Sequence, residues 1–259
     1  MVKRMMAVVA VTAMVSSAQA AFTEDFESGI HVVGQEPGAP WESLWENQYG
    51  NGNYIAGHIA NGYGTNTSKV LDMVDSASWG SPITALDPAN QFSMGFVQWD
   101  MATPNDDGSG ARARAWFNTD GAVGGPSSGD WVVNLSFISD AGSNDIWERP
   151  PGSNYFNQTT PPNRADGVMQ LNEWETYRVD FNFLDGVNGS WQLYRNDVQI
   201  LSGALGTDGL ASTKTLQAIG WADPTGDGFL IDNIIVDIPE PSAGLLLAGG
   251  LALLIRRRA

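Results

Sequence analysis

The fold is decided by the stretch Tyr177-Arg178-Val179-Asp180-Phe181-Asn182-Phe183, which alternates apolar and polar residues. Successive side chains of a β-strand point to opposite faces of the sheet. The alternation therefore predicts a strand with one face on a core and the other in water. The residues expected on the core face are Tyr177, Val179, Phe181 and Phe183.

Turn residues separate this strand from others of the same kind. The run Asp185-Gly186-Val187-Asn188-Gly189 returns the chain, and Asn196-Asp197 predicts a tight turn because Asn and Asp tolerate the left-handed conformation. Ten runs rich in aromatic and β-branched residues are predicted to be strands: 22–27, 68–74, 91–101, 111–118, 131–139, 174–184, 190–194, 198–201, 216–221 and 229–238. The sequence therefore predicts an all-β chain of antiparallel hairpins.

The predicted strands follow one another without a linker or an internal repeat. One extended loop is expected between residues 140 and 166, because Pro150-Pro151 and Pro161-Pro162 interrupt regular pairing. Residues 21–238 are therefore expected to form a single domain, a two-sheet antiparallel β-sandwich.

The composition excludes several classes of protein. The chain has 259 residues, with 13 Lys+Arg against 29 Asp+Glu and a formal net charge of −16. A surface this acidic repels phosphate, which argues against a nucleic-acid partner. There is no cysteine, so disulfide scaffolds and thiolate metal sites are excluded.

The first 20 residues have the three parts of a secretory signal peptide. Lys3 and Arg4 are followed by an apolar run over residues 5–15 and by Ala18-Gln19-Ala20, whose small residues suit a signal peptidase. We expect cleavage between Ala20 and Ala21. The alternative is an N-terminal membrane anchor, but the apolar run is too short to cross a hydrocarbon core of about 30 Å.

The last 21 residues also have three parts. Pro239-Glu240-Pro241 precedes an uncharged stretch over residues 242–255, and the chain closes with Arg256, Arg257 and Arg258 before its final alanine. This arrangement resembles the PEP-CTERM sorting signal of exported bacterial proteins. The resemblance implies recognition by a membrane-embedded exosortase, cleavage near Pro-Glu-Pro and a link to exopolysaccharide.

That resemblance also implies a location. The protein is expected to be exported to the cell surface, outer envelope or extracellular space after transient anchoring of its tail helix in the inner membrane. The prolines keep the recognition segment out of helix, and the arginines hold the end at the cytoplasmic face. The alternative is an ordinary C-terminal anchor that is never processed.

The middle of the chain carries a second resemblance. Asn172-Glu173-Trp174 enters a strand, and Trp191-Gln192-Leu193-Tyr194-Arg195-Asn196-Asp197-Val198 follows after a loop. This hairpin resembles the central hairpin of concanavalin A-like (laminin G-like) jelly rolls. Residues 24–29 and 228–236 are similar to the first and last strands of jelly-roll carbohydrate-binding modules. The resemblance implies a jelly-roll β-sandwich and a polysaccharide ligand.

In such modules a structural Ca²⁺ often ties the first strand to the last. The matching residues are Glu27 and Asp232, and Ca²⁺ would suit an acidic domain because it binds six to eight oxygens. The alternative is that Asp232 caps a loop through hydrogen bonds, as buried polar groups usually do.

Aromatic residues in loops are the candidates for stacking on sugar rings. They are Trp41, Trp45, Tyr49, Tyr54, Trp147 and Tyr155. The alternative for each is a place in the core, which is the usual environment of an aromatic ring in a sandwich.

Catalytic patterns are missing from the sequence. There is no Glu-x-Asp-x-x-Glu strand of the laminarinase type and no G-x-S-x-G, and His31 and His58 are the two histidines. We therefore predict a non-catalytic, exported glycan-binding protein. The alternatives are a glycan-active hydrolase or lyase whose carboxylates come from separate strands, and a purely structural envelope protein.

Overall fold

The structure is a computed structural model. It describes residues 22–33, 35, 39–43, 58–73, 82–104, 111–119, 131–140, 143–148, 163–185, 188–205, 215–226 and 229–238. The predicted signal peptide and sorting tail lie outside these residues, and so do their cleavage sites. Within the described residues, no helix has the length and apolar character needed to cross a membrane.

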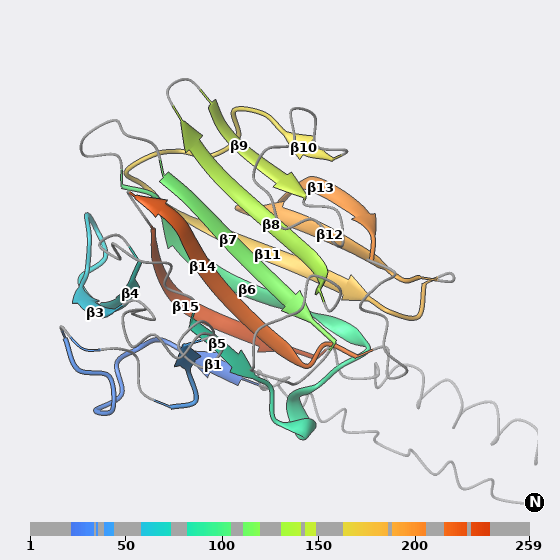
Figure 1. The fold of residues 1–259 in the computed structure, drawn as a ribbon, viewed down its shortest axis with the longest axis horizontal. Coiled ribbons are helices and arrows are strands. Elements are labelled where there is room, and N and C mark those ends of the chain that lie inside the picture. Colours follow the sequence, from blue (N-terminus) through green and yellow to red (C-terminus); the bar gives the residue numbers. More distant parts are fainter. Residues whose placement is uncertain are drawn as a thin grey trace, which may run out of the picture. The chain divides into compact units, whose positions relative to one another are not determined.

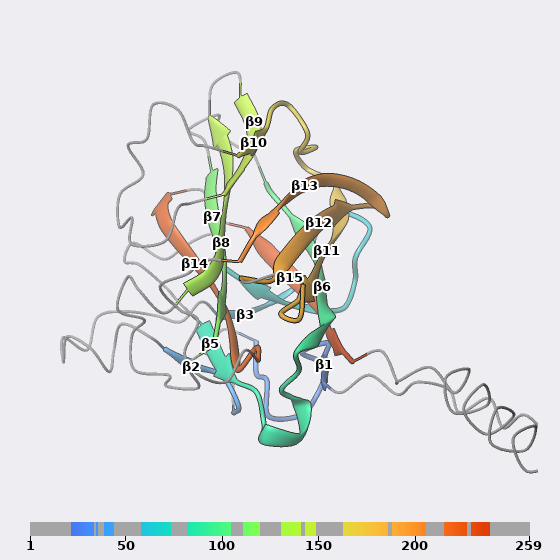
Figure 2. The same ribbon diagram turned by 90° about the vertical axis from the view of Figure 1, so that its right-hand side faces the viewer.

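The chain forms two antiparallel sheets that pack face to face (Figures 1 and 2). Sheet A has the order β13-β12-β11-β6-β15-β4-β3, with β1 also paired to β15. Its strands are β13 (Val198–Ala204), β12 (Ser190–Arg195), β11 (Trp174–Asn182), β6 (Met94–Ala102), β15 (Leu230–Asp237), β4 (Lys69–Asp72), β3 (His58–Asn61) and β1 (Phe22–Glu24). The predicted all-β sandwich is confirmed.

Sheet B has the order β10-β9-β8-β7-β14-β5-β2. Its strands are β10 (Arg164–Ala165), β9 (Ser143–Glu148), β8 (Trp131–Asp140), β7 (Ala111–Asn118), β14 (Ala218–Gly226), β5 (Pro82–Ala85) and β2 (Glu42–Ser43). A short 3₁₀-helix, η1 (Pro88–Asn90), precedes β6. Neighbours along each sheet come from distant parts of the chain, as when β14 pairs with both β7 and β5.

Strand β11 follows the predicted alternation without a break. Its buried residues include Tyr177, Val179 and Phe181, and its polar residues between them are half-buried on the other face. Phe183, just after the strand, is buried too. The core lies between the sheets, where the Tyr177 ring stacks on Trp99 at 5.9 Å and meets Phe137 edge-on at 5.1 Å.

The tight turn between β12 and β13 is also confirmed. Asn196 and Asp197 both have positive φ, at 47° and 64°, as a two-residue hairpin turn with the right twist requires. The amide oxygen of Asn196 accepts a hydrogen bond from the backbone of Thr176 at 2.9 Å, which joins the turn to β11.

Five strands were not expected from the sequence. The prediction of a loop between residues 140 and 166 was wrong for its two ends, because β9 pairs with β8 and β10 pairs with β9. β9 stops before Pro150 and β10 begins after Pro162, so the prolines limit the strands without excluding them. β2, β3 and β5 have two to four residues each, too few to show a period.

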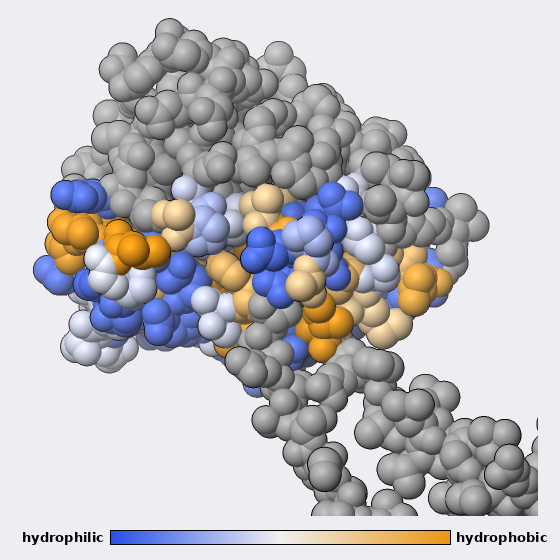
Figure 3. Space-filling view, turned by 90° about the horizontal axis from the view of Figure 1, so that it is seen from below, coloured by the Kyte–Doolittle hydropathy of each residue, from blue (hydrophilic) through white to orange (hydrophobic). Residues whose placement is uncertain are grey.

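The described surface is mixed in character. Seen from below, hydrophobic residues are interspersed with hydrophilic ones (Figure 3). The exposed large hydrophobic residues are Ile30, Val32, Val33, Met94, Leu184 and Val198. Ile30, Val32 and Val33 are neighbours in the sequence, and Met94, Leu184 and Val198 are single exposed residues of the kind that folded domains normally show.

Candidate functional site

The two predicted calcium ligands contact the same short segment, residues 66–69, from different sides. Glu27 is exposed, and its carboxylate accepts a hydrogen bond from the backbone nitrogen of Lys69. The Lys69 ammonium in turn donates to the carbonyl oxygen of His31 at 3.1 Å. The segment that follows β1 is thereby fixed to β4 by protein groups.

Asp232 is almost completely buried on β15. Its carboxylate accepts hydrogen bonds from the Asn66 side chain, the Ser68 hydroxyl and the Asn233 backbone nitrogen, each at 2.8 Å. Burial raises the pKa of Asp232, and the hydrogen bonds from Asn66 and Ser68 partly oppose that shift. These contacts have the form of the hydrogen-bonded loop cap.

In the structure the Asp232 carboxylate is held by protein donors. The oxygens of Asp232 already accept three hydrogen bonds, and the described residues include no group of three His, Cys, Asp or Glu that could hold a metal ion. Ca²⁺ prefers six to eight oxygen ligands. We therefore assign no step to a metal at Glu27 and Asp232.

Two of the predicted stacking aromatics are described. Trp41 is 5% exposed and packs against Phe26 and Trp221 at 6.0 and 5.8 Å, while its indole nitrogen donates to Glu24. A ring enclosed in this way has no open face for a sugar, so Trp41 belongs to the core. Trp147 is half-buried on β9. The other four candidates, Trp45, Tyr49, Tyr54 and Tyr155, lie outside the described residues.

Trp147 belongs to a row of side chains on the face of sheet B that points away from the core. Across the strands, Arg114 pairs with Ser136, Ser136 with Trp147, and Trp147 with Arg164. Residues directly opposite in a sheet share a face, and the intervening residues, such as Leu135, are in the core. Beside this row, Trp116 pairs with Asn134. We call this surface the outer face of sheet B.

The polar side chains of this outer face are enclosed. Asn134 is 3% and Ser136 is 1% exposed. Within the described part of the chain, the Asn134 amide, the Ser136 hydroxyl and the indole nitrogen of Trp147 have no hydrogen-bond partner. Buried polar groups in folded proteins nearly always find partners, so the unpartnered groups beside Trp147 call for an explanation.

The Arg164 guanidinium packs on one side of the Trp147 ring. The Arg164 guanidinium lies 5.6 Å from the centre of its ring and 3.4 Å from the carboxylate of Asp145. Asp145 is buried and also accepts from the backbone nitrogen of Gly167 at 2.8 Å. The outer face thus combines a held aromatic ring with hydrogen-bond donors and acceptors, which together suit a hydroxyl-rich ligand.

Sequence reasoning did not identify Asn134 and Ser136 as binding residues. Both lie in a predicted strand, 131–139, whose alternate positions put the two residues on one side. That pattern is indistinguishable from an ordinary solvated face. What identifies them is their burial on the outer side of a sheet, which depends on the packing of the whole chain.

Comparisons with known proteins place this arrangement among solved structures. No family model and no curated protein matches the chain. The Emp47p carbohydrate recognition domain superposes with a TM-score of 0.52 at 12% identity, covering 86% of this chain and 97% of that one. The fold is a lectin-like jelly roll.

Two further structures agree on this fold. A carbohydrate esterase from the Shiga toxin-encoding bacteriophage phi24B gives a TM-score of 0.53 at 13% identity, over 86% of this chain and 99% of its own. The globular domain of T. cruzi calreticulin gives 0.51 at 12% identity, over 93% and 99%. Identities this low show the shared jelly roll and leave function to the residues of the site.

Proposed function

We propose that the protein is a non-catalytic glycan-binding protein and that the glycan binds at the outer face of sheet B. The observation that carries the proposal is the half-buried ring of Trp147, which is held by Arg164 and lies in register with Ser136, beside Asn134. The hydroxyl groups of a sugar both donate and accept hydrogen bonds, so they would complete all three residues. The jelly-roll fold, which this chain shares with a carbohydrate recognition domain, supports the proposal.

The chemistry of the outer face favours binding over hydrolysis. Hydrolysis of a glycosidic bond needs two carboxyl groups that flank the bond, one of them free to transfer a proton. Asp145 lies two residues before Trp147 on β9, on the same face. Its carboxylate pairs with the Arg164 guanidinium and accepts a hydrogen bond from the backbone nitrogen of Gly167. A carboxylate engaged in this way serves to position its partners.

We also propose that the protein is exported through its first 20 residues and sorted to the cell surface by an exosortase acting on residues 239–259. The signal-peptide pattern and the Pro-Glu-Pro, apolar and arginine parts of the tail support this. The intact mass of the protein recovered from the envelope is the test. A chain that begins at Ala21 and ends near Pro239 is expected, and one that retains residue 1 or 259 would contradict the proposal.

Glycan binding is tested by affinity electrophoresis of the full chain through gels that contain neutral or acidic polysaccharides. Retardation by at least one polysaccharide is expected, with a loss of about 10-fold or more in affinity for Asn134→Leu and for Ser136→Ala. Ser28→Ala, at an exposed position outside both sheets, is the matched control. Retardation by no polysaccharide would favour a structural envelope role, and shortening of the polymer would favour an enzyme.

A further inference from the structure

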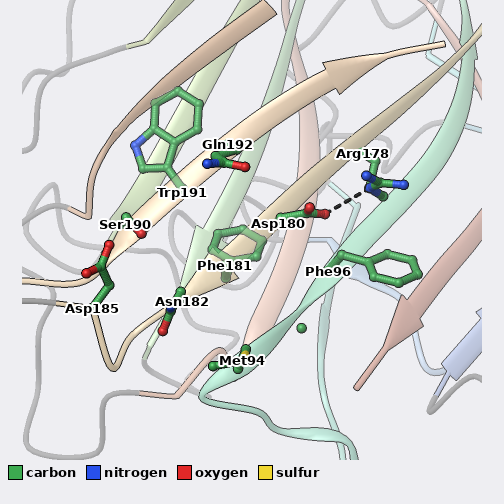
Figure 4. Close-up of a pocket in the computed structure, with 11 residues that line it drawn as sticks. Met94, Phe96, Arg178, Asp180, Phe181, Asn182, Asp185, Ser190, Trp191 and Gln192 are labelled. Carbon is green, nitrogen blue, oxygen red and sulfur yellow. Dashed lines mark hydrogen bonds and ion pairs between the residues drawn. The ribbon is translucent and has the colours of Figure 1, made fainter. Parts of the chain in front are cut away.

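A groove lies on the outer face of sheet A, the face that points away from sheet B. Its volume is about 530 Å³, and its lining comes from β6, β11, β12 and the turn after β11 (Figure 4). Ligand sites for small molecules range from about 300 to 1,000 Å³, so the groove has room for one or two sugar residues.

The amides in the groove are oriented by their own hydrogen bonds. The side-chain oxygen of Asn182 accepts from the backbone nitrogen of Leu184 at 3.0 Å, and that of Gln192 accepts from the Tyr194 hydroxyl at 2.6 Å. An amide whose oxygen is engaged presents its NH₂ group to the remaining space. The groove therefore has hydrogen-bond donors on β11 and on β12 (Figure 4).

Between these donors lies an acceptor that is held in place. Asp180 accepts from the Nε of Arg178 at 2.9 Å, and the Arg178 guanidinium lies 4.5 Å from the Tyr194 ring centre and 5.6 Å from that of Phe96. Burial raises the pKa of Asp180, although Arg178 acts in the opposite direction. The second carboxylate oxygen of Asp180 can accept from a ligand hydroxyl without reorganisation.

Apolar surface and negative charge complete the lining. Met94 is 46% exposed and Phe96 is half-buried on β6, so the groove offers apolar contacts beside its polar groups. Asp180 and Asp185 line it together with Arg178, which pairs with Asp180, so the three charged groups sum to one negative charge, and the whole chain has a net charge of −16. These charges repel uronates and phosphates. A neutral sugar, with an apolar CH face and hydroxyls at its rim, matches all of these features.

We propose that this groove is a second glycan site, for neutral sugar residues, and that the protein cross-links polysaccharide strands. The cross-linking part rests on the proposed function of the outer face of sheet B. Sites on opposite sides of one sandwich cannot engage adjacent sugars of a single short segment, so each captures its own strand. Two glycan sites on one protein then bind a polymer network more tightly than either site does alone, because the second site binds at a high effective concentration.

The groove is tested by isothermal titration of the full chain with neutral hexasaccharides of glucose, mannose, galactose and fructose. At least one is expected to bind. Gln192→Glu and Asn182→Asp keep the bonds to Tyr194 and Leu184 but lose the NH₂ donors, so each should weaken groove binding about 10-fold or more. Gln199→Glu adds the same charge at an exposed position outside the groove and should bind as the wild type does.

Failure of this site and failure of the outer face of sheet B give different results. Binding that is lost in Gln192→Glu but retained in Asn134→Leu supports the groove, whatever the other face does. Binding lost in Asn134→Leu alone, or binding of no neutral hexasaccharide, overturns the groove and leaves the proposed function to its own test.

Cross-linking is measured by light scattering of the corresponding neutral polymer as protein is added. Scattering should rise with the wild type and with Gln199→Glu, and it should stay flat with either Gln192→Glu or Asn134→Leu. Equal scattering from the wild type and either single-site variant would refute cross-linking through the two faces. Thermal unfolding of each variant verifies that it is folded.

Discussion

Replacement of Asn134 by leucine is expected to stabilise the protein while it abolishes glycan binding. The Asn134 amide is 3% exposed, and among the residues that the structure describes neither its nitrogen nor its oxygen has a hydrogen-bond partner. An unsatisfied buried polar group costs about 1–3 kcal/mol. Leucine has a similar size and no polar atom, and it can pack against Trp116 on the neighbouring strand.

The expected gain for Asn134→Leu in the absence of glycan is about 2 kcal/mol, taking one penalty for the whole amide. In a domain of about 200 residues this corresponds to a rise in Tm of about 4–8 °C. Urea denaturation followed by tryptophan fluorescence measures the free energy of unfolding, and affinity electrophoresis of the same sample measures binding.

Asn66→Leu is the matched control, because the Asn66 amide is fully used. It donates to Asp232 and accepts from the Ser68 backbone nitrogen, each at 2.8 Å. The same substitution should destabilise the protein there by about 2–4 kcal/mol, since it leaves a buried carboxylate short of a donor. If Asn134→Leu also destabilised the protein by more than about 1 kcal/mol, the amide would have a protein partner and the argument for a ligand site would fail.

Three further predictions concern stability. Trp41→Ala should cost about 3–5 kcal/mol, measured by urea denaturation, and leave glycan retardation unchanged, because Trp41 is a core ring. Asp232→Ala should lower Tm, because protein donors hold that carboxylate in the folded state. EDTA should leave the Tm of the wild type unchanged, and a fall in Tm with EDTA would support the calcium prediction. Burial raises the pKa of Glu148 above its ordinary value of 4.5, and it raises the pKa values of Asp180 and Asp232 above 3.8. At a pH just above these ordinary values, the folded state therefore binds more protons than the unfolded state. The free energy of unfolding should therefore rise as the pH falls from 7 towards 4.5. Asp180→Asn should make this dependence of the unfolding free energy on pH less steep, as measured by urea denaturation at several pH values. The same dependence in the variant and the wild type would contradict the assignment.

Much of the architecture could be read from local patterns. The alternation in β11 determines which of its residues face the core, because a strand has a period of two whatever its neighbours are. The Asn196-Asp197 turn is equally local, since few other residues adopt positive φ at low cost. The signal-peptide and tail patterns are local as well, and they are the sole basis for the proposals on export and sorting.

The tertiary structure alone decided the rest. The Asp232 carboxylate meets Asn66 and Ser68 across more than 160 residues of chain, and β9 is ordered by its pairing with β8 rather than by its own composition. An alternating strand has two faces, but whether its polar face is solvated or enclosed depends on what the remaining chain places over it. The sequence by itself therefore determined the strands and turns, while burial, partners and hence the candidate site at Asn134 and Ser136 were decided by long-range packing.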